Sequence, residues 1–335
     1  MTNPGIKALT RMPHVTADEW KTLSTISRWL IATRAAVLIM TFISAAIAGL
    51  VAFRHHEFRW PQWLALAFGL MFAHATNNLL NDRSDFLRGV DKNNYYRTQY
   101  GIQPLASGVM TLRQNLVYAA ITAALAVACG LPLVLANGIW GWALLASGAF
   151  FVLCYTWPLK YFAMGELAVF LVWGPLMVAG GHFVIANRFE WDAVLACVPY
   201  ALGVTAVIFG KHIDKRAEDK EKRIFTLPVV LGDRLSRAIL GATAIVPYFF
   251  VAGMVLFGGF HPVLLVVLFA LPALKRALPV FLSDKPATPE LTPVWYEKDL
   301  WPNWYVALAF YHNRAFGVWF MIGLFADAVI SFYLN

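Results

Sequence analysis

The sequence predicts an all-α protein that crosses a membrane several times. Of its 335 residues, 59% are hydrophobic and only 14% are charged, against about 25% charged residues in an average soluble domain. Apolar runs of about 20 residues, the length that spans a bilayer as a helix, recur along most of the chain. The basic residues fall mainly between those runs. The net charge of +8 therefore does not indicate a nucleic-acid partner.

Nine apolar segments are candidate membrane spans. They cover residues 29–53, 60–80, 115–136, 139–157, 165–187, 192–213, 236–258, 262–283 and 307–333. The last is the least uniform, because Arg314 and Asp327 lie within it. No low-complexity segment or long linker interrupts the series. We therefore expect a cytoplasmic N-terminal segment, residues 1–28, followed by one transmembrane domain, residues 29–335.

Lysine and arginine in the segments between spans predict the orientation. They gather in residues 1–28 and after the second and sixth spans, whereas the loops on the other side hold only Arg54, Arg59 and Arg188. Because basic loops stay in the cytoplasm, we expect the N-terminus there and, with nine spans, the C-terminus outside. We expect a multi-pass protein of the cell membrane, in contact with the lipid bilayer, whose active site faces the cytoplasm.

The second span runs into an acidic stretch, "HATNNLLNDRSDFLRGVD", residues 74–91. If the helix continues, Asn78, Asp82 and Asp85 recur at i, i+4 and i+7 and share one face. Asp91 follows in the loop. Such oxygen ligands suit Mg²⁺, which is held by one or two carboxylates together with substrate phosphates and waters. Carboxylates at membrane depth are costly and usually functional. The alternative is that Asn and Asp only terminate the helix.

The sixth span ends in a second acidic stretch on the same predicted side of the membrane. Asp214 and Glu218 recur at i, i+4, and Asp219 lies one position round the helix. Two such clusters predict two Mg²⁺ ions with a diphosphate between them. The alternative is a solvated helix end that carries the opposite-charge pairs Lys215–Asp219 and Glu218–Lys222. The basic residues available to complete an anion site are Arg34, Arg97, Lys160, Lys211, Lys222 and Arg223.

Four stretches resemble motifs of a known family. "NNLLNDRSDFLRGVD" (77–91) resembles the first aspartate-rich motif of the UbiA superfamily of intramembrane prenyltransferases, and "DKRAEDKEKRIFTLPVVLG" (214–232) resembles the second. "QPLASG" (103–108) resembles the segment after the first motif. "GELAVFLVWGPL" (165–176) is most similar to the menaquinone-type dihydroxynaphthoate prenyltransferases. The resemblance extends from about Arg34 to Gly232.

The resemblance implies nine transmembrane helices around a central cavity. It also implies that Mg²⁺ binds an isoprenyl diphosphate, and that the prenyl chain passes to an acceptor, usually an aromatic one. The candidate catalytic residues are then Asp82, Asp85, Asp214 and Lys160. The candidate Mg²⁺ ligands, by match or by spacing, are Asn78, Asp82, Asp85, Asp91, Asp214, Glu218 and Asp219.

The chain departs from the family pattern at three places. Gln103, a candidate for binding the diphosphate, stands where members often have Arg. Lys211-His212 stands where menaquinone-type members tend to have Asn-Asn. Asp214 and Asp219 are five residues apart instead of the commoner four. These departures bear on the acceptor more than on the reaction.

The sequence therefore predicts Mg²⁺-dependent transfer of a prenyl group to an aromatic, quinone-precursor-like acceptor. Tyr155, Trp157 and Phe162 are candidates to shield the allylic cation from water, and Tyr155 also counts among the donor-binding residues. One alternative is a secondary transporter, although transporter sites usually lie near the membrane midplane. Another keeps the fold with a different donor or acceptor, namely a phosphoribosyl donor or a porphyrin-type, chlorophyll-type or lipid acceptor.

Overall fold

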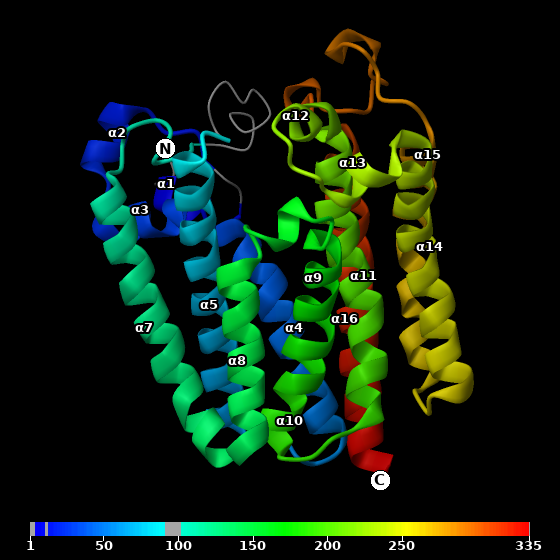
Figure 1. Ribbon diagram of the computed structural model, residues 1–335. Coiled ribbons are helices and arrows are strands. Elements are labelled where there is room, and N and C mark those ends of the chain that lie inside the picture. The colour runs from blue at the N-terminus through cyan, green and yellow to red at the C-terminus, as the bar shows by residue number, and fades with distance from the viewer. Residues whose placement is uncertain (1–3, 11–12, 91–101, 335) are drawn as a thin grey trace. The chain divides into compact units, whose positions relative to one another are not determined.

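The computed structural model describes residues 4–10, 13–90 and 102–334, which fold as helices joined by mostly short segments (Figure 1). No β-strand forms within those residues, and one isolated bridge pairs Phe162 with Phe225. The predicted all-α class is confirmed, because long apolar runs without period-2 alternation satisfy their backbone hydrogen bonds within each helix.

The contacts divide the chain into two compact units. Unit 1 comprises Met1–Ile43 and Leu64–Trp157, and unit 2 comprises Ser44–Trp63 and Pro158–Asn335. Two long helices, α4 (Ala35–Arg54) and α5 (Trp60–Leu87), contribute residues to both units. The expectation that residues 29–335 act as one transmembrane domain stays a prediction.

Unit 1 combines short N-terminal helices with long apolar ones. Besides its parts of α4 and α5, its helices are α1 (Pro4–Lys7), α2 (Ala17–Thr22), α3 (Thr25–Ala32), α7 (Leu112–Ala136) and α8 (Gly138–Cys154). Figure 1 shows α5, α7 and α8 side by side, with α1 to α3 near one end of them. Thr16 and Thr111 begin α2 and α7 with capping boxes completed by Glu19 and Gln114, which satisfy N–H groups that the first helical turn leaves free.

The N-terminal segment belongs to the packed interior of unit 1. Ala8 and Trp20 are buried in one apolar cluster. The same cluster contains Leu79 of α5, Ala119 of α7 and Leu105, which precedes α7. Burial of these side chains gives the short helices a hydrophobic driving force that their length alone does not supply. The segment therefore lies against the end of α5 that carries the first acidic stretch.

Unit 2 contains the second half of the chain. Besides its parts of α4 and α5, its elements are η1 (Leu159–Tyr161), α9 (Gly165–Leu171), η2 (Val172–Ala179), α10 (Gly180–Ala186), α11 (Trp191–Asp214), α12 (Arg216–Glu221), α13 (Leu227–Leu231), α14 (Asp233–Phe257), η3 (Pro262–Ala270), α15 (Leu271–Leu282), η4 (Pro289–Leu291), η5 (Lys298–Leu300) and α16 (Trp304–Leu334). α11 is buried along most of its length and packs against α16, α14 and η2. Figure 1 shows α12 and α13 at one end of α11.

One helical segment of unit 2 has π-helical hydrogen bonding. η2 is a π-helix that joins α9 to α10 within one continuous apolar stretch, and Pro175 lies inside it. Proline has no N–H to donate to the preceding turn, so one hydrogen bond of the regular helical ladder is missing there. The hydroxyl of Ser44 donates a hydrogen bond to the carbonyl oxygen of Trp173 at 2.9 Å.

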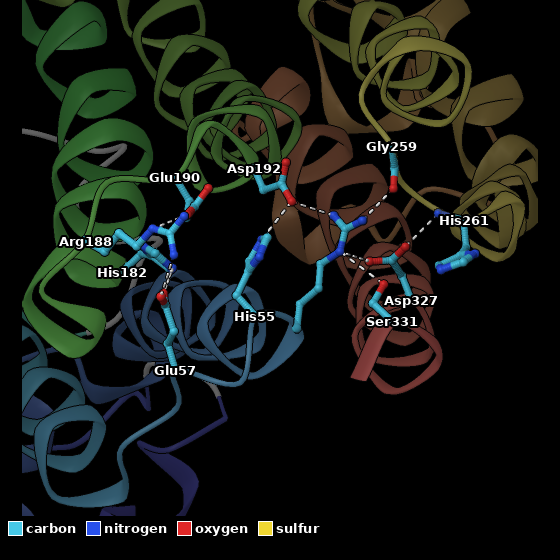
Figure 2. Close-up of polar contacts among 11 residues, drawn as sticks. His55, Glu57, His182, Arg188, Glu190, Asp192, Gly259, His261, Asp327 and Ser331 are labelled. Atoms are coloured by element: carbon cyan, nitrogen blue, oxygen red, sulfur yellow. Dashed lines mark hydrogen bonds and ion pairs between the residues drawn. The ribbon is translucent and has the colours of Figure 1, made fainter. Parts of the chain in front are cut away.

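A buried polar network ties helix ends together at the start of α11 (Figure 2). The guanidinium of Arg54, at the end of α4, donates to Asp192 at 2.8 Å and to Ser331 at 3.1 Å. It also lies 3.5 Å from the carboxylate of Asp327 and donates to the carbonyl oxygen of Gly259. Four elements distant in sequence therefore share one cation.

Seven helices in the described part of the chain are long and apolar enough to cross a membrane. They are Ala35–Arg54, Leu112–Ala136, Gly165–Ala186, Trp191–Asp214, Asp233–Phe257, Pro262–Leu282 and Trp304–Leu334. The predicted spans at 60–80 and 139–157 correspond to α5 and α8, which fall outside this set. α8 has 17 residues, and α5 carries His74 and a run of amides in its second half. Nine spans therefore stay a prediction.

Candidate active site

The first acidic stretch lies on the extended α5 helix. This helix runs through Leu87, so Asn78, Asp82 and Asp85 share one face, as their spacing predicts. Only 6%, 4% and 1% of these residues is exposed. Asp91 and Arg97, the other predicted site residues of this region, lie outside the described residues. The helix therefore continues past the apolar run and buries its acidic residues.

The break between α3 and α4 brings polar groups to the acidic face of α5. Arg34 lies between α3 and α4 with a left-handed φ of 55°, a conformation that L-residues rarely adopt. Its guanidinium forms an ion pair with Asp82 and donates to the side-chain oxygen of Gln103 at 3.4 Å. The amide of Asn78 donates to the carbonyl oxygen of Thr33 at 2.8 Å. The structure thus brings four predicted site residues of unit 1 together.

The second acidic stretch begins where α11 ends. Asp214 is the last residue of α11 and its side chain is fully buried. It contacts the ammonium of Lys285 at 3.3 Å and the first N–H groups of α16. Burial lowers the pKa of Lys285, while the charge of Asp214 opposes that shift. Asp214 thus faces α16, and its partners come from the C-terminal third of the chain.

Glu218 and Asp219 lie on the short helix α12, after Asp214. Lys215 donates to one carboxylate oxygen of Asp219 at 3.4 Å. The other oxygen of Asp219, and one oxygen of Glu218, are buried without a hydrogen-bond partner in the described residues. Buried unpaired carboxylate oxygens are costly, so these two atoms are suited to a bound cation.

The remaining predicted residues take varied positions. Tyr155, partly buried, follows the last residue of α8 in unit 1. Lys211 lies in the last turn of α11 and is partly buried. Lys222 and Arg223 follow α12, where Arg223 is exposed with a left-handed φ of 55°.

Lys160 is buried on η1, close to a buried histidine–carboxylate contact that spacing alone does not predict. The Nδ1 atom of His212 lies 2.6 Å from a carboxylate oxygen of Glu166. A Cβ added at Gly165 would lie 3.5 Å from the Cα of Lys160 and 3.9 Å from Cε1 of His212. The η1 segment, the start of α9 and the end of α11 therefore pack together. The Glu166–His212 contact and the Lys285–Asp214 contact are polar features that spacing along the sequence does not predict. The two partners are 46 residues apart in the first contact and 71 residues apart in the second.

The residues present fit a magnesium ion that shares its coordination with a substrate. In the part of the chain that the structure describes, no three His, Cys, Asp or Glu side chains gather into a site that holds a metal by themselves. Mg²⁺ does not need such a cage, because it binds through one or two carboxylates and completes its shell with phosphates and waters. The unpaired oxygens of Glu218 and Asp219 provide such ligands.

Comparison with known proteins decides the family. The model of the UbiA prenyltransferase family matches residues 38–295, most of the chain. The chain belongs to the UbiA prenyltransferase family. It is accordingly an enzyme that transfers prenyl groups, and its apolar helices make it a multi-pass membrane protein.

Curated relatives of this UbiA protein include named prenyltransferases. The chain is 24% identical over 262 residues to the 1,4-dihydroxy-2-naphthoate octaprenyltransferase of Bacillus subtilis (strain 168), across 76% of this chain and 81% of that protein. It is 30% identical over 197 residues to the protein of the same name from Mycobacterium tuberculosis, across 57% of this chain and 65% of that protein. The menaquinone-type resemblance of the sequence motifs is thereby confirmed.

Solved structures share the UbiA fold. A UbiA homolog from Archaeoglobus fulgidus bound to GPP and Mg²⁺ aligns with a TM-score of 0.56 at 14% identity, covering 89% of this chain and 99% of that one. A digeranylgeranylglyceryl phosphate synthase aligns with a TM-score of 0.58 at 16% identity, covering 90% and 98%. At such identities the likeness concerns the fold alone.

Proposed function

We propose that this UbiA protein transfers a prenyl group from an isoprenyl diphosphate to an aromatic, quinone-precursor-like acceptor in a Mg²⁺-dependent reaction. The observation that carries the proposal is the buried face of α5, where Asn78, Asp82 and Asp85 lie with the Arg34 guanidinium beside them. Buried carboxylates and a cation at the end of an apolar helix suit a metal-bound anion better than they suit lipid.

The proposed ligands come from both aspartate-rich stretches. For unit 1 they are Asn78, Asp82, Asp85 and Asp91, and for unit 2 they are Glu218 and Asp219. The residues proposed to contact the diphosphate are Arg34, Arg97, Gln103, Tyr155, Lys160, Lys211, Lys222 and Arg223. Mg²⁺, when bound, supplies positive charge that neutralises the leaving diphosphate.

In the proposed reaction the allylic C–O bond breaks and its electron pair leaves with the diphosphate. The chain's cations stabilise the negative charge that develops on the diphosphate. Such electrostatic stabilisation is usually the largest single contribution to catalysis. A ring carbon of the acceptor forms the new C–C bond, and the ring then regains its aromaticity by losing a proton or carbon dioxide. Tyr155, Trp157 and Phe162 are proposed to keep water from the allylic carbon.

The acceptor proposed first is 1,4-dihydroxy-2-naphthoate, after the names of the relatives in Bacillus subtilis and Mycobacterium tuberculosis. The digeranylgeranylglyceryl phosphate synthase among the fold neighbours makes a glyceryl phosphate lipid the second acceptor to test. We also propose that the protein lies in the cell membrane with its N-terminus and site on the cytoplasmic side and its C-terminus outside.

The test uses purified protein in lipid vesicles, a radiolabelled isoprenyl diphosphate and each acceptor in turn, with Mg²⁺ or with EDTA. We expect a prenylated product of the dihydroxynaphthoate acceptor, with or without its carboxylate, only with Mg²⁺. Asp82→Asn and Asp82→Ala should each lower the rate at least about 100-fold, the scale of losing one preorganised electrostatic contact. The control is Asp18→Ala, since the side chain of Asp18 is 94% exposed in the same unit.

Two outcomes contradict the proposal. Full activity in both Asp82 variants rejects the metal assignment. Turnover in EDTA equal to that in Mg²⁺ rejects the metal dependence. Product with the glyceryl phosphate lipid alone replaces the aromatic acceptor and leaves prenyl transfer in place.

A further inference from the structure

Asp214 makes four polar contacts with the C-terminal part of the chain. One carboxylate oxygen accepts hydrogen bonds from the N–H groups of Trp304 and Tyr305, each at 3.2 Å, and lies 3.3 Å from the ammonium of Lys285. The other accepts from the N–H of Val306 at 3.0 Å. We call these contacts the α16 anchor. Three donors share one oxygen of the carboxylate, and one donor contacts the other oxygen.

The anchor also matches the electrostatics of a helix start. The first N–H groups of α16 have no partner within their own helix, and the positive end of the helix dipole favours a negative charge there. α16 is 31 residues long, so its first turn carries the full effect. Coordination of a metal by the oxygen that faces Trp304, Tyr305 and Lys285 would compete with three of these contacts.

The packing of α11 against α16 directs Asp214 to this position. Gly210 lies one turn before Asp214 on the same face of α11. A Cβ added at Gly210 would lie 3.1 Å from the N atom of Val306 and from the carbonyl carbon of Tyr305. The missing side chain therefore lets the start of α16 come within reach of the carboxylate.

The five-residue spacing of Asp214 and Asp219 has a structural counterpart. Residues four apart share a helical face, and the residue four before Asp219 is Lys215, which contacts Asp219 at 3.4 Å. Lys215 is itself buried. Asp214 faces α16, while Glu218 and Asp219 each keep one buried oxygen without a hydrogen-bond partner in the described residues.

We propose that Asp214 is a structural anchor for α16 and the Lys285 segment, and that Glu218 and Asp219 alone supply the carboxylate ligands of the second acidic stretch. This inference rests on the proposed Mg²⁺ dependence. It assigns Lys285, 71 residues beyond Asp214, to the support of the site. It also assigns Lys215 as the hydrogen-bond partner of Asp219 within the stretch.

The experiment measures two quantities on detergent-purified full-length protein. The first is the melting temperature in EDTA, followed by tryptophan fluorescence. The second is the affinity and number of Mn²⁺ ions bound in the presence of inorganic diphosphate, measured by electron paramagnetic resonance. The variants are Asp214→Asn and Glu218→Gln. The matched control is Glu221→Gln, since Glu221 is an exposed carboxylate on the same short helix α12.

The two variants should separate the two roles. Asp214→Asn should lower the metal-free melting temperature by about 5 °C or more, because buried N–H groups and Lys285 lose a charged acceptor, and it should bind as many Mn²⁺ ions as the wild type. Glu218→Gln should melt within about 1 °C of the wild type and bind Mn²⁺ at least about tenfold more weakly. Glu221→Gln should change neither quantity.

Loss of a Mn²⁺ ion from Asp214→Asn with an unchanged melting temperature overturns the inference. If Asp214→Asn does not fold, Glu218→Gln decides, because wild-type Mn²⁺ affinity in that variant also overturns it. Absence of Mn²⁺ binding in the wild type overturns the proposed metal dependence itself. The failure of the function and the failure of this assignment are therefore distinguishable.

Discussion

Arg54 shows what a single buried charge does in unit 2. Only 8% of the residue is exposed, and its guanidinium contacts Asp192, Asp327 and Ser331 (Figure 2). From the sequence, Asp327 is a charge within the last apolar span, where a structural role is expected for it. The structure makes it part of a network that joins the end of α4 to α16.

Replacement of Arg54 should be strongly destabilising. Arg54→Met leaves the carboxylates of Asp192 and Asp327 without their cation, and the side chain of Asp327 is fully buried. Removal of one partner of a buried pair costs about 3 kcal/mol or more, which should appear as a lower melting temperature in detergent. Arg59→Met is the control, since Arg59 is exposed. Equal melting temperatures for the two variants contradict this role of Arg54.

The His55–Asp192 contact makes stability depend on pH. His55 lies just beyond α4, and its Nε2 atom is 2.9 Å from the carboxylate of Asp192. This hydrogen bond raises the pKa of His55 above its ordinary value of 6.5, with Glu190 adding to the shift and burial and Arg54 opposing it. Because the folded pKa is the higher one, the contact stabilises fully below pH 6.5, and the stabilisation is lost as pH rises through the folded value.

The measurement is the melting temperature of the wild type and of His55→Gln across that range. The wild type should exceed the variant by several degrees at about pH 5.5, and the difference should shrink by about pH 8.5. The control is His56→Gln, because His56 contacts the ring of Phe332 and has no carboxylate contact in the described part of the chain. A difference that grows with pH contradicts the assignment.

At the scale of elements, close helix packing depends on where side chains are missing. α7 and α8 are joined by a turn at Asn137. A Cβ added at Gly141 of α8 would lie 2.5 Å from the carbonyl oxygen and 2.8 Å from the Cα of Val134 in α7. A backbone atom cannot move aside as a flexible side chain can, so this glycine sets the distance between the two helices.

Gly141→Ala should therefore force α7 and α8 apart and lower the melting temperature, by about 5 °C or more. Gly148→Ala is the matched control in the same helix, since a Cβ there meets nothing within 4 Å. Alanine has the higher helix propensity, so the control should melt no lower than the wild type. A Gly141→Ala protein as stable as the Gly148→Ala protein contradicts the packing argument.

The distribution of basic residues along the whole chain predicts its orientation in the membrane. α11 connects Phe189, which precedes it, with Lys220, which follows it on α12, and both are exposed. The loop after α11 is rich in Lys and Arg, and such loops stay in the cytoplasm. The two ends of α11 should therefore face opposite compartments.

Cysteine accessibility tests the orientation. In a background without Cys129, Cys154 and Cys197, Lys220→Cys should react with a membrane-impermeant maleimide only after the cytoplasmic face is opened. Phe189→Cys should react in intact cells. The parent without cysteines provides the background signal. Labelling of both positions from one side rules out a single crossing by α11, and labelling in the reverse order rejects the proposed orientation.

Features that depend on local period and composition can be predicted from the amino-acid pattern. The all-α class, most of the spans and the shared face of Asn78, Asp82 and Asp85 follow from apolar runs and from the 3.6-residue turn, and none of them needs a distant partner. The helix limits were less predictable at α5, because its amide-rich end dilutes the apolar signal while burial in unit 1 keeps it helical.

Contacts between distant groups follow from how the helices pack. The ion pair of Arg34 with Asp82 spans 48 residues and depends on a left-handed break between two helices. The contact of Asp214 with α16 spans about 90 residues and depends on the small Gly210 beside it. The spacing of carboxylates along a chain shows which face of their helix they share. Their partners depend on how the helices pack, which the hydrophobic pattern of a single sequence does not encode at the level of single side chains.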